Sequence, residues 1–142
     1  MSFGTPPLVA SASHSPPAAA LSSEMIFVSV STPLKDSGVG AGFAPDLQHW
    51  ERIARLIARL SSSSKVIVER STVPVKTASA MTKVLTAVNR MSSPWVVLSN
   101  PEFATEGNAV MDQASPERIM IGGGESDEEM AAVDKLAAVY AR

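Results

Sequence analysis

The sequence contains no cysteine and only two histidines. The absence of cysteine excludes disulfides, thiolate zinc sites and thiol nucleophiles within this chain. The two histidines, His14 and His49, lie far apart and in segments of different character. Because a transition metal is held by a cluster of suitable ligands, we expect no metal site.

The chain also lacks a strong excess of charge and any long apolar run. Twelve Lys and Arg residues stand against fourteen Asp and Glu, which gives a net charge of -2. That balance leaves no basic surface of the kind that binds nucleic acid. The apolar runs are far shorter than the ~20 residues that cross a bilayer as a helix. We therefore expect neither nucleic acid nor a membrane as a partner.

The first 24 residues lack the pattern of a secreted or folded segment. They are rich in Pro, Ala and Ser, and no basic stretch precedes an apolar core as it does in a secretory signal. We interpret residues 1–24 as a disordered tail. Residues 25–142 then have the length of about one domain.

Three short apolar runs alternate with two helical patterns. The runs span residues 25–30, 65–69 and 95–98. The patterns at 46–60 and 76–91 place apolar residues at three- and four-residue steps. Strands that alternate with helices indicate an α/β fold with a parallel sheet. Ligands bind such sheets beyond the carboxyl ends of the strands, so the polar loops there are the candidate site.

A short fourth strand and a further helix are expected near the end of the chain. The apolar segment 118–121 precedes a glycine run, and residues 126–129 fit a capping box. That glycine run lacks the Lys-Ser/Thr pair of a phosphate loop, and the glycines of residues 37–43 do not join a strand directly to a helix. We interpret the glycine run as a turn and residues 37–43 as a mobile loop. The chain stops at Arg142 inside a helical pattern, which we interpret as a sign that it is a piece of a longer protein.

The loop after the second run is Ser71-Thr72-Val73-Pro74-Val75. Proline is well placed at the first helical position, and the helix amides would then face an anion or another electron-rich group. The alternative is that Ser71 or Thr72 merely caps the helix. The corresponding loop after the first run, residues 29–34, is by itself an ordinary turn.

The loop after the third run repeats this design. Asn100 can cap a helix, Pro101 can begin a helical turn, and Glu102 and Glu106 would then share one face. In a closed crevice one carboxyl could serve as a general acid or base. In solvent the pair would be only a charged helix start, and the spacing leaves both interpretations open.

Four segments together resemble a known family. The strings FVSVSTPLKDSG, ERSTVPVKTA, LSNPEFATEGNAVMD and PERIMIGG are similar to UDP-glucose 6-dehydrogenases of the UDP-glucose/GDP-mannose dehydrogenase family. The resemblance runs from about residue 24 to residue 142, and it implies the later part of an NAD-binding, Rossmann-like domain. Family members oxidise UDP-glucose twice, to UDP-glucuronate, and reduce two NAD. The resemblance implies cofactor contacts at Val30, Ser31, Thr32, Pro33, Leu34, Ser71, Thr72, Val73 and Glu106.

The resemblance also implies roles in catalysis and substrate binding. It assigns acid-base catalysis to Glu102 and the positioning of a catalytic water to Thr72. The family commonly has Leu-Ala where this chain has Ala104-Thr105, which leaves the fit of the pocket open. The implied substrate contacts are Glu102, Phe103, Ala104, Thr105 and Glu106.

Several parts of the family pattern have no counterpart in this sequence. The first strand with its G-x-G-x-x-G loop, the catalytic cysteine and the UDP-binding half are missing. Without them NAD loses its main anchor and the second oxidation loses its covalent intermediate. The strand at 25–30 also loses its neighbour and would become an exposed apolar edge. We therefore expect the isolated chain to be catalytically inactive, and either marginally stable or oligomeric.

Two alternatives remain open from the sequence. The chain could be a non-catalytic short form that associates with a full-length dehydrogenase through its open sheet edge. It could also belong to a relative that acts on GDP-mannose or a UDP-amino sugar. Because the family's enzymes are cytoplasmic homo-oligomers, we expect the same of the parent protein.

Overall fold

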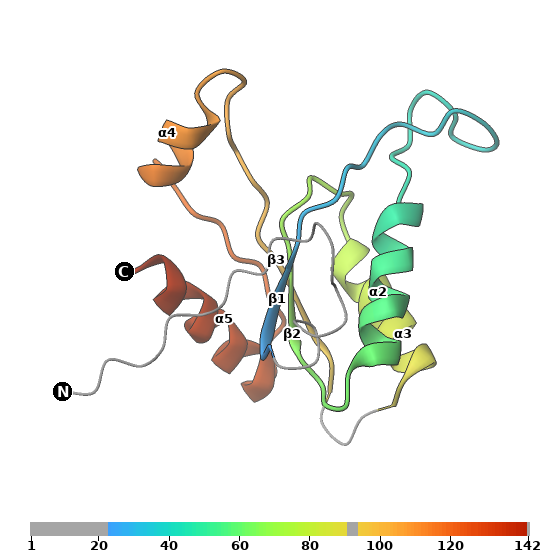
Figure 1. Ribbon diagram of the computed structural model, residues 1–142, viewed down its shortest axis with the longest axis vertical. Coiled ribbons are helices and arrows are strands. Elements are labelled where there is room, and N and C mark those ends of the chain that lie inside the picture. Colours follow the sequence, from blue (N-terminus) through green and yellow to red (C-terminus); the bar gives the residue numbers. More distant parts are fainter. Residues whose placement is uncertain (1–22, 91–93, 142) are drawn as a thin grey trace.

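Three parallel strands form the centre of the molecule. The computed structural model describes residues 23–90 and 94–141, and its strands are β1 (Met25–Val28), β2 (Val66–Glu69) and β3 (Val96–Ser99) (Figure 1). They lie in the order β1-β2-β3, and both pairings are parallel. The expected α/β fold with a parallel sheet is confirmed.

Helices cover the two faces of this sheet unequally. α2 (Gln48–Leu60) and α3 (Thr77–Val88) lie together on one face, and α5 (Asp127–Tyr140) lies on the other (Figure 1). The short helix α4 (Ala109–Ala114) stands away from the sheet, and none of its residues is buried. We call the extended segment that carries this helix, residues 101–119, the arm. The part of the chain described by the structure contains no helix long and apolar enough to cross a membrane.

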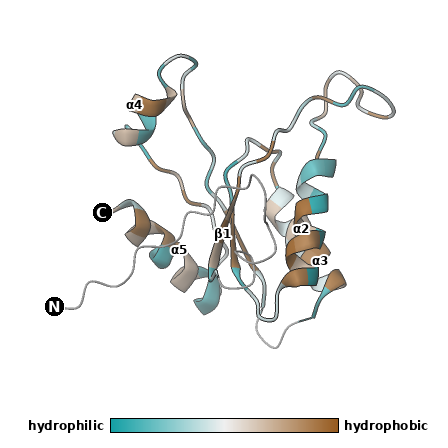
Figure 2. Ribbon diagram, in the orientation of Figure 1, coloured by the Kyte–Doolittle hydropathy of each residue, from teal (hydrophilic) through white to brown (hydrophobic). Residues whose placement is uncertain are grey.

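The alternation of side chains along each strand produces two cores. Ile67 of β2 packs toward α2 and α3, and the next residue, Val68, packs toward α5. Figure 2 shows the strands as a hydrophobic layer between the helices. The buried residues on the α2/α3 face are Val28, Trp50, Ala54, Ile57, Ala58, Ile67, Met81, Leu85, Trp95 and Val97. Those on the α5 face are Val68, Val96, Leu98, Ala132 and Leu136.

The helix starts differ from the sequence expectations in two places. α2 begins at Gln48 with Leu47 in the cap position, although Asp46 Oδ1 still accepts a hydrogen bond from the Gln48 amide at 2.9 Å. α3 begins at Thr77, so Pro74 does not occupy the first helical position. Lys76 has a left-handed backbone with φ 71°, which makes a turn before the helix. The expectation that Ser71 or Thr72 caps this helix is therefore wrong.

The segment after β3 also differs from its prediction. Residues 101–105 form no helical turn, so Glu102 and Glu106 do not share a helical face. The expected fourth strand is only a single antiparallel bridge between Ser99 and Gly122, with two backbone hydrogen bonds of 2.8 and 2.7 Å. The predicted capping box is confirmed, since Ser126 and Glu129 exchange hydrogen bonds at the start of α5.

β1 lies at an edge of the sheet among the described strands. Its Phe27 side chain is 45% exposed, as an edge position allows. The tail predicted over residues 1–24 falls, except for its last two residues, outside the described part of the chain.

Candidate functional site

The loops that follow β1 and β2 are joined by side-chain hydrogen bonds. Ser71 Oγ accepts from the Val30 amide at 3.0 Å and donates to the Val30 carbonyl at 2.7 Å. Thr32 Oγ1 donates to the Thr72 carbonyl at 3.1 Å. Ser71 therefore acts as a bridge between the two loops in place of the capping role considered from the sequence.

The loops that follow β2 and β3 continue the backbone pairing of the sheet. The Asn100 amide donates to the Glu69 carbonyl at 2.9 Å, and the Glu102 amide donates to the Arg70 carbonyl at 3.2 Å. This pairing carries Arg70 and Glu102 side by side beyond the last paired residues of the strands. The three loops thus meet at the carboxyl edge of the sheet, where parallel sheets bind ligands.

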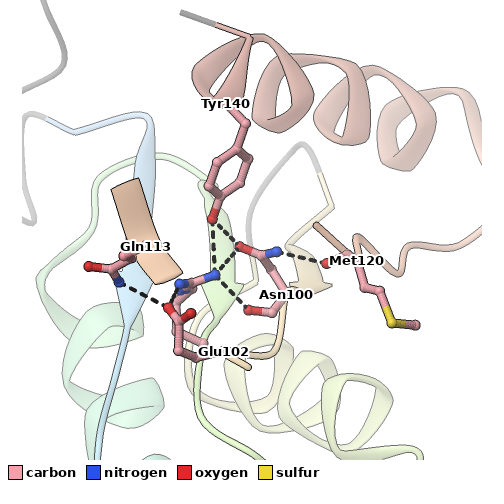
Figure 3. A network of polar contacts seen from close by, with 6 residues as sticks. Asn100, Glu102, Gln113, Met120 and Tyr140 are labelled. Carbon is pink, nitrogen blue, oxygen red and sulfur yellow. Dashed lines mark hydrogen bonds and ion pairs between the residues drawn. The ribbon is translucent and has the colours of Figure 1, made fainter. Parts of the chain in front are cut away.

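A polar network lies on the α5 side of this edge, and Figure 3 labels its residues Asn100, Glu102, Gln113, Met120 and Tyr140. The hydrogen bonds and the ion pair of Arg70 put this residue at its centre. Its Nη1 donates to Asn100 Oδ1 at 2.9 Å, to the Asn100 carbonyl at 3.2 Å and to Tyr140 Oη at 3.0 Å. Tyr140 Oη also donates to Asn100 Oδ1 at 2.5 Å, and Asn100 Nδ2 donates to the Met120 carbonyl at 2.7 Å. Asn100 is completely buried, and the network leaves its amide group well satisfied.

Glu102 is held at the open side of this network. Its Oε2 forms an ion pair with Arg70 Nη2 and accepts a hydrogen bond from Gln113 Nε2 at 2.9 Å. Glu102 Oε1 makes no hydrogen bond within residues 23–90 and 94–141. The side chain is 34% exposed, so the carboxylate is anchored through Oε2 and remains partly open to solvent.

A cleft of about 240 Å³ lies beside Glu102, between the end of β3, the arm and α5. On the arm, the Arg118 guanidinium lies 5.1 Å above the centre of the Phe103 ring, a cation–π distance. Asp112 accepts from the Thr105 amide at 2.8 Å, and this hydrogen bond lowers the pKa of Asp112. The lining residues are Arg70, Asn100, Pro101, Glu102, Phe103, Thr105, Asp112, Gln113, Ser115, Pro116, Glu117, Arg118, Ile119 and Tyr140.

Glu69 is a second acidic residue at this edge, but it faces α2. Its side chain is 1% exposed, and burial raises its pKa from 4.5 to about 7, against a smaller lowering by the Trp50 indole. Within the described part of the chain, neither Trp50 Nε1 nor Glu69 Oε1 has a well-aligned hydrogen bond. The indole therefore compensates only weakly for the desolvation of this carboxyl.

The sequence model of the NAD-binding domain of the UDP-glucose/GDP-mannose dehydrogenase family matches residues 9–142. The chain belongs to this family. The match begins within the segment that sequence analysis sets apart as a tail, and it confirms the family expected from the motifs.

Plant enzymes are among the relatives of this chain. UDP-glucose 6-dehydrogenase 1 of Glycine max is 50% identical over 119 residues, which is 84% of this chain and 25% of the relative. UDP-glucose 6-dehydrogenase 4 of Oryza sativa subsp. japonica is 53% identical over 117 residues, 82% of this chain and 24% of the relative. The chain thus spans about a quarter of the length of these relatives.

Solved structures of the family share the fold. A UDP-glucose dehydrogenase from the archaeon Pyrobaculum islandicum superposes with a TM-score of 0.74 at 30% identity, over 90% of this chain and 28% of that one. A GDP-mannose dehydrogenase from Pseudomonas aeruginosa has a TM-score of 0.72 at 28% identity, over 86% and 27%. These similarities confirm the Rossmann-like architecture.

The residues predicted to act in catalysis and substrate binding fall into two groups, those that line the cleft and those that do not. Glu102, Phe103 and Thr105 line the cleft, whereas Ala104 and Glu106 are exposed residues outside its lining. Thr72 is exposed on the neighbouring loop and also lies outside the lining. The structure therefore brings Glu102 together with two predicted substrate contacts at the cleft, whereas Thr72 lies on the neighbouring loop outside the lining.

The predicted cofactor residues lie along the edge formed by the first two loops. The start of α3 has no side-chain cap, which leaves helix amides there for an acceptor. Neither the connection from β1 to α2 nor that from β2 to α3 is a short glycine turn of the kind that holds a pyrophosphate. The residues 30–34 and 71–73 therefore fit contact with one portion of a dinucleotide.

Sequence reasoning missed three residues of the network: Arg70, Asn100 in its actual role, and Tyr140. A charged residue directly after a buried strand was a usable signal for Arg70, because such a position lies at the ligand edge of the sheet. Tyr140 is distant in sequence, and no local pattern connects it with Asn100. The described residues hold no cluster of three or more metal-binding side chains.

Proposed function

We propose that this chain forms the later part of the NAD-binding domain of an NAD-dependent UDP-glucose 6-dehydrogenase. The observation that carries this proposal is the position of Glu102. Its carboxylate lies at the carboxyl edge of a parallel sheet and is anchored through Oε2, and the residue is partly exposed and lines a cleft. Plant relatives that are 50–53% identical bear the name UDP-glucose 6-dehydrogenase.

In the proposed reaction a primary alcohol of UDP-glucose is oxidised to an acid in two steps. Bound NAD supplies the hydride acceptor of each step. Glu102 acts as general base, since its free oxygen can take the proton that the alcohol or an attacking water releases. Phe103 and Thr105 contact the substrate from the arm, and Thr72 positions the water from the neighbouring loop.

The proposal assigns cofactor contact to residues 30–34, 71–73 and Glu106. In this arrangement Ser71 holds the first two loops together and sets their separation. The proposal further holds that the isolated chain does not turn over, because its loops provide no pyrophosphate anchor. NADH formation by the purified chain with NAD and UDP-glucose would contradict this last point.

A chimera tests the function directly. The matching 119-residue segment of the Glycine max enzyme is replaced by the corresponding segment of this chain. We expect the chimera to reduce NAD in the presence of UDP-glucose. Glu102→Gln should lower kcat by about 10²–10⁴-fold, the usual contribution of a general base.

Glu128→Gln is the matched control for that variant. Glu128 is an exposed acid in the first turn of α5 and lies outside the cleft lining, so its kcat should stay within about twofold of the parent chimera. A chimera that folds and assembles like the Glycine max enzyme but yields no NADH would reject the proposed function. Full activity of the Glu102→Gln chimera would reject the assigned base.

We also propose that the parent protein is a cytoplasmic homo-oligomer. The support for the parent protein is the family relationship. The edge position of β1 and the exposure of Phe27 support self-association of the isolated 142-residue chain only, because the family's preceding strand would cover this edge. Light scattering of the purified chimera and of the 142-residue chain tests the oligomeric state. Imaging of a tagged protein in cells tests the compartment.

A further inference from the structure

Arg70 lies directly after β2, and its side chain binds polar groups of Asn100, Tyr140 and Glu102 at the same time. Its side chain is only 14% exposed, and Nη1 alone donates to Asn100 Oδ1, the Asn100 carbonyl and Tyr140 Oη. Nη2 is directed to a different partner, the carboxylate of Glu102. The planar guanidinium can meet both requirements at once because its donors form a rigid fork.

The anchors on the inner side of Arg70 are rigid. Asn100 is fully buried and donates to the Met120 carbonyl at 2.7 Å, while Tyr140 reaches Asn100 Oδ1 from the last turn of α5. The guanidinium is therefore held by Asn100, which directly follows β3, and by Tyr140 of α5, and the Met120 carbonyl in turn fixes Asn100. These contacts exist independently of Glu102, so they orient the guanidinium before it meets the carboxylate.

The effect on Glu102 is asymmetric. Arg70 and Gln113 both bind Oε2, and Oε1 has no hydrogen bond within the described residues. A carboxylate accepts both bonds, whereas a proton placed on Oε2 would compete with them. The arrangement thus favours the ionised carboxylate and leaves Oε1 as the oxygen that can take a proton.

No other cation of the cleft competes for this role among the residues that the structure describes. The charged and titratable groups that line it are Arg70, Glu102, Asp112, Glu117, Arg118 and Tyr140. Asp112 is engaged by the Thr105 amide and by Asn108 Nδ2, and Arg118 lies over the Phe103 ring. Of the residues that the structure describes, only Arg70 forms an ion pair with Glu102.

We propose that Arg70 is a positioning residue for the general base: its guanidinium, oriented by Asn100 and Tyr140, keeps Glu102 ionised and directs Oε1 to the cleft. This inference rests on the proposed function for the role of Glu102 in catalysis. The ion pair itself and its effect on the charge of Glu102 can be tested without turnover. A purely structural Arg70, which only ties α5 to the sheet, would leave the titration of Glu102 unchanged.

The first experiment follows the Glu102 carboxyl carbon by NMR in the 142-residue chain as a function of pH. Arg70→Gln should raise the titration midpoint of Glu102 by about one pH unit, the lower end of the effect of a neighbouring opposite charge. Arg70→Lys should restore most of the difference, because it retains the charge. An unchanged midpoint in a folded Arg70→Gln chain would overturn the proposal.

Two further variants complete this experiment. Arg55→Gln is the matched control, since it removes an exposed arginine paired with Glu51 and should leave the Glu102 midpoint in place. Tyr140→Phe keeps the packing of α5 but removes one anchor of the guanidinium. If Arg70→Gln does not fold, a smaller rise in Tyr140→Phe still supports the proposal, and no rise contradicts it.

The second experiment uses the chimera. In Arg70→Gln the acid limb of the pH profile of kcat should move to higher pH, with the KM for UDP-glucose within about threefold of the parent, and Arg70→Lys should reverse most of the shift. A fall in kcat without any movement of the profile would show a structural role only. If the NMR shift is present while the parent chimera is inactive, the positioning stands and the proposed function fails.

Discussion

Glu69 and Arg70 are neighbours in the chain, but they face opposite sides of the sheet and meet opposite environments. Glu69 points to the α2/α3 face, where it is buried and its Oε1 finds no hydrogen-bond partner among the described residues. Arg70 points to the α5 face, where it meets Asn100, Tyr140 and Glu102. The apolar α2/α3 face thus contains one poorly compensated acid, and the smaller α5 face contains a satisfied polar network.

The comparison shows that the end of β2 faces an apolar core on one side of the sheet and a polar network beside the cleft on the other. Ten buried residues pack on the α2/α3 face and five on the α5 face. A large apolar core tolerates a desolvated carboxyl at a cost in free energy, because the surrounding burial is favourable. On the α5 face the polar network occupies the space near the cleft, where charge and hydrogen bonds are needed.

The largest expected effect is the loss of folding stability when a leucine is removed from either core, and this loss should differ between the two cores. Leu85→Ala, in the centre of the α2/α3 face, should lower the free energy of unfolding by about 4 kcal/mol, and Leu136→Ala, on the α5 face, by about 2 kcal/mol. Both leucines are completely buried, so the difference reports how far each core can close around the cavity. Urea unfolding followed by tryptophan fluorescence measures both values.

Leu56→Ala is the control for these variants. Leu56 is 38% exposed on α2, so its removal should cost less than about 1 kcal/mol. Equal losses in Leu85→Ala and Leu136→Ala would show that the two cores close equally well around a cavity, and the comparison between them would fail.

Glu69→Gln should give the next largest effect. The pKa of Glu69 is raised from 4.5 in the unfolded chain to about 7 in the fold, so the folded state binds more protons between these values. Its contribution to stability is therefore fully present below pH 4.5 and is lost as the pH rises through 7. The rise corresponds to about 3 kcal/mol, so Glu69→Gln should stabilise the protein by at most this amount at pH 8.

The measurement is the free energy of unfolding between pH 4 and pH 8. The parent chain should lose stability between pH 4.5 and pH 7, and Glu69→Gln should lose much less. Glu128→Gln provides an exposed comparison and should follow the parent curve. Parallel curves for the parent and Glu69→Gln would show that the carboxyl is compensated by its surroundings.

The sequence was sufficient for most of the fold but only for part of the site; the expected fourth strand is a single bridge, and α4 was not predicted. Apolar runs and helical periodicity predicted all three strands, α2, α3 and α5, and the capping box at Ser126 was correct. These features depend on local residue patterns. The motifs also led to the family and to the loop that carries Glu102, because those residues are contiguous in sequence.

The predictions that were wrong or missing concern features that depend on contacts between residues far apart in the sequence. A helical turn at Pro101 was reasonable from its neighbours, but backbone pairing of Glu102 with Arg70 keeps this segment extended. Ser71 looked like a helix cap, yet it bonds Val30, which lies 41 residues earlier. The Tyr140 contact with Asn100 spans 40 residues. No propensity or spacing in one sequence reports such partners.

A smaller effect is expected from the polar network itself. Tyr140→Phe removes one hydroxyl that donates to Asn100 and accepts from Arg70, and it should cost about 1–2 kcal/mol. Thr82→Val is the matched control, since the Thr82 hydroxyl bonds only the Ala78 carbonyl within α3. The loss in Tyr140→Phe should exceed that in Thr82→Val, as measured by urea unfolding. Equal losses would show that the network adds nothing beyond an ordinary hydrogen bond.

The smallest effect is expected from the Arg55–Glu51 pair. Comparing this exposed pair with the Arg70–Glu102 pair isolates the influence of burial on an ion pair. Arg55 and Glu51 lie one turn apart on α2 with a contact of 2.7 Å, and both side chains are almost half exposed. Glu51→Gln should cost only about 0.2–0.5 kcal/mol, and less in 1 M salt, because solvent and ions screen the pair. Glu102→Gln, measured in the same way, should change less with salt, since Arg70 is held at 14% exposure. The same salt dependence for both variants would mean that the network does not shield Arg70 from solvent, and the distinction between the anchored pair and an ordinary surface pair would disappear.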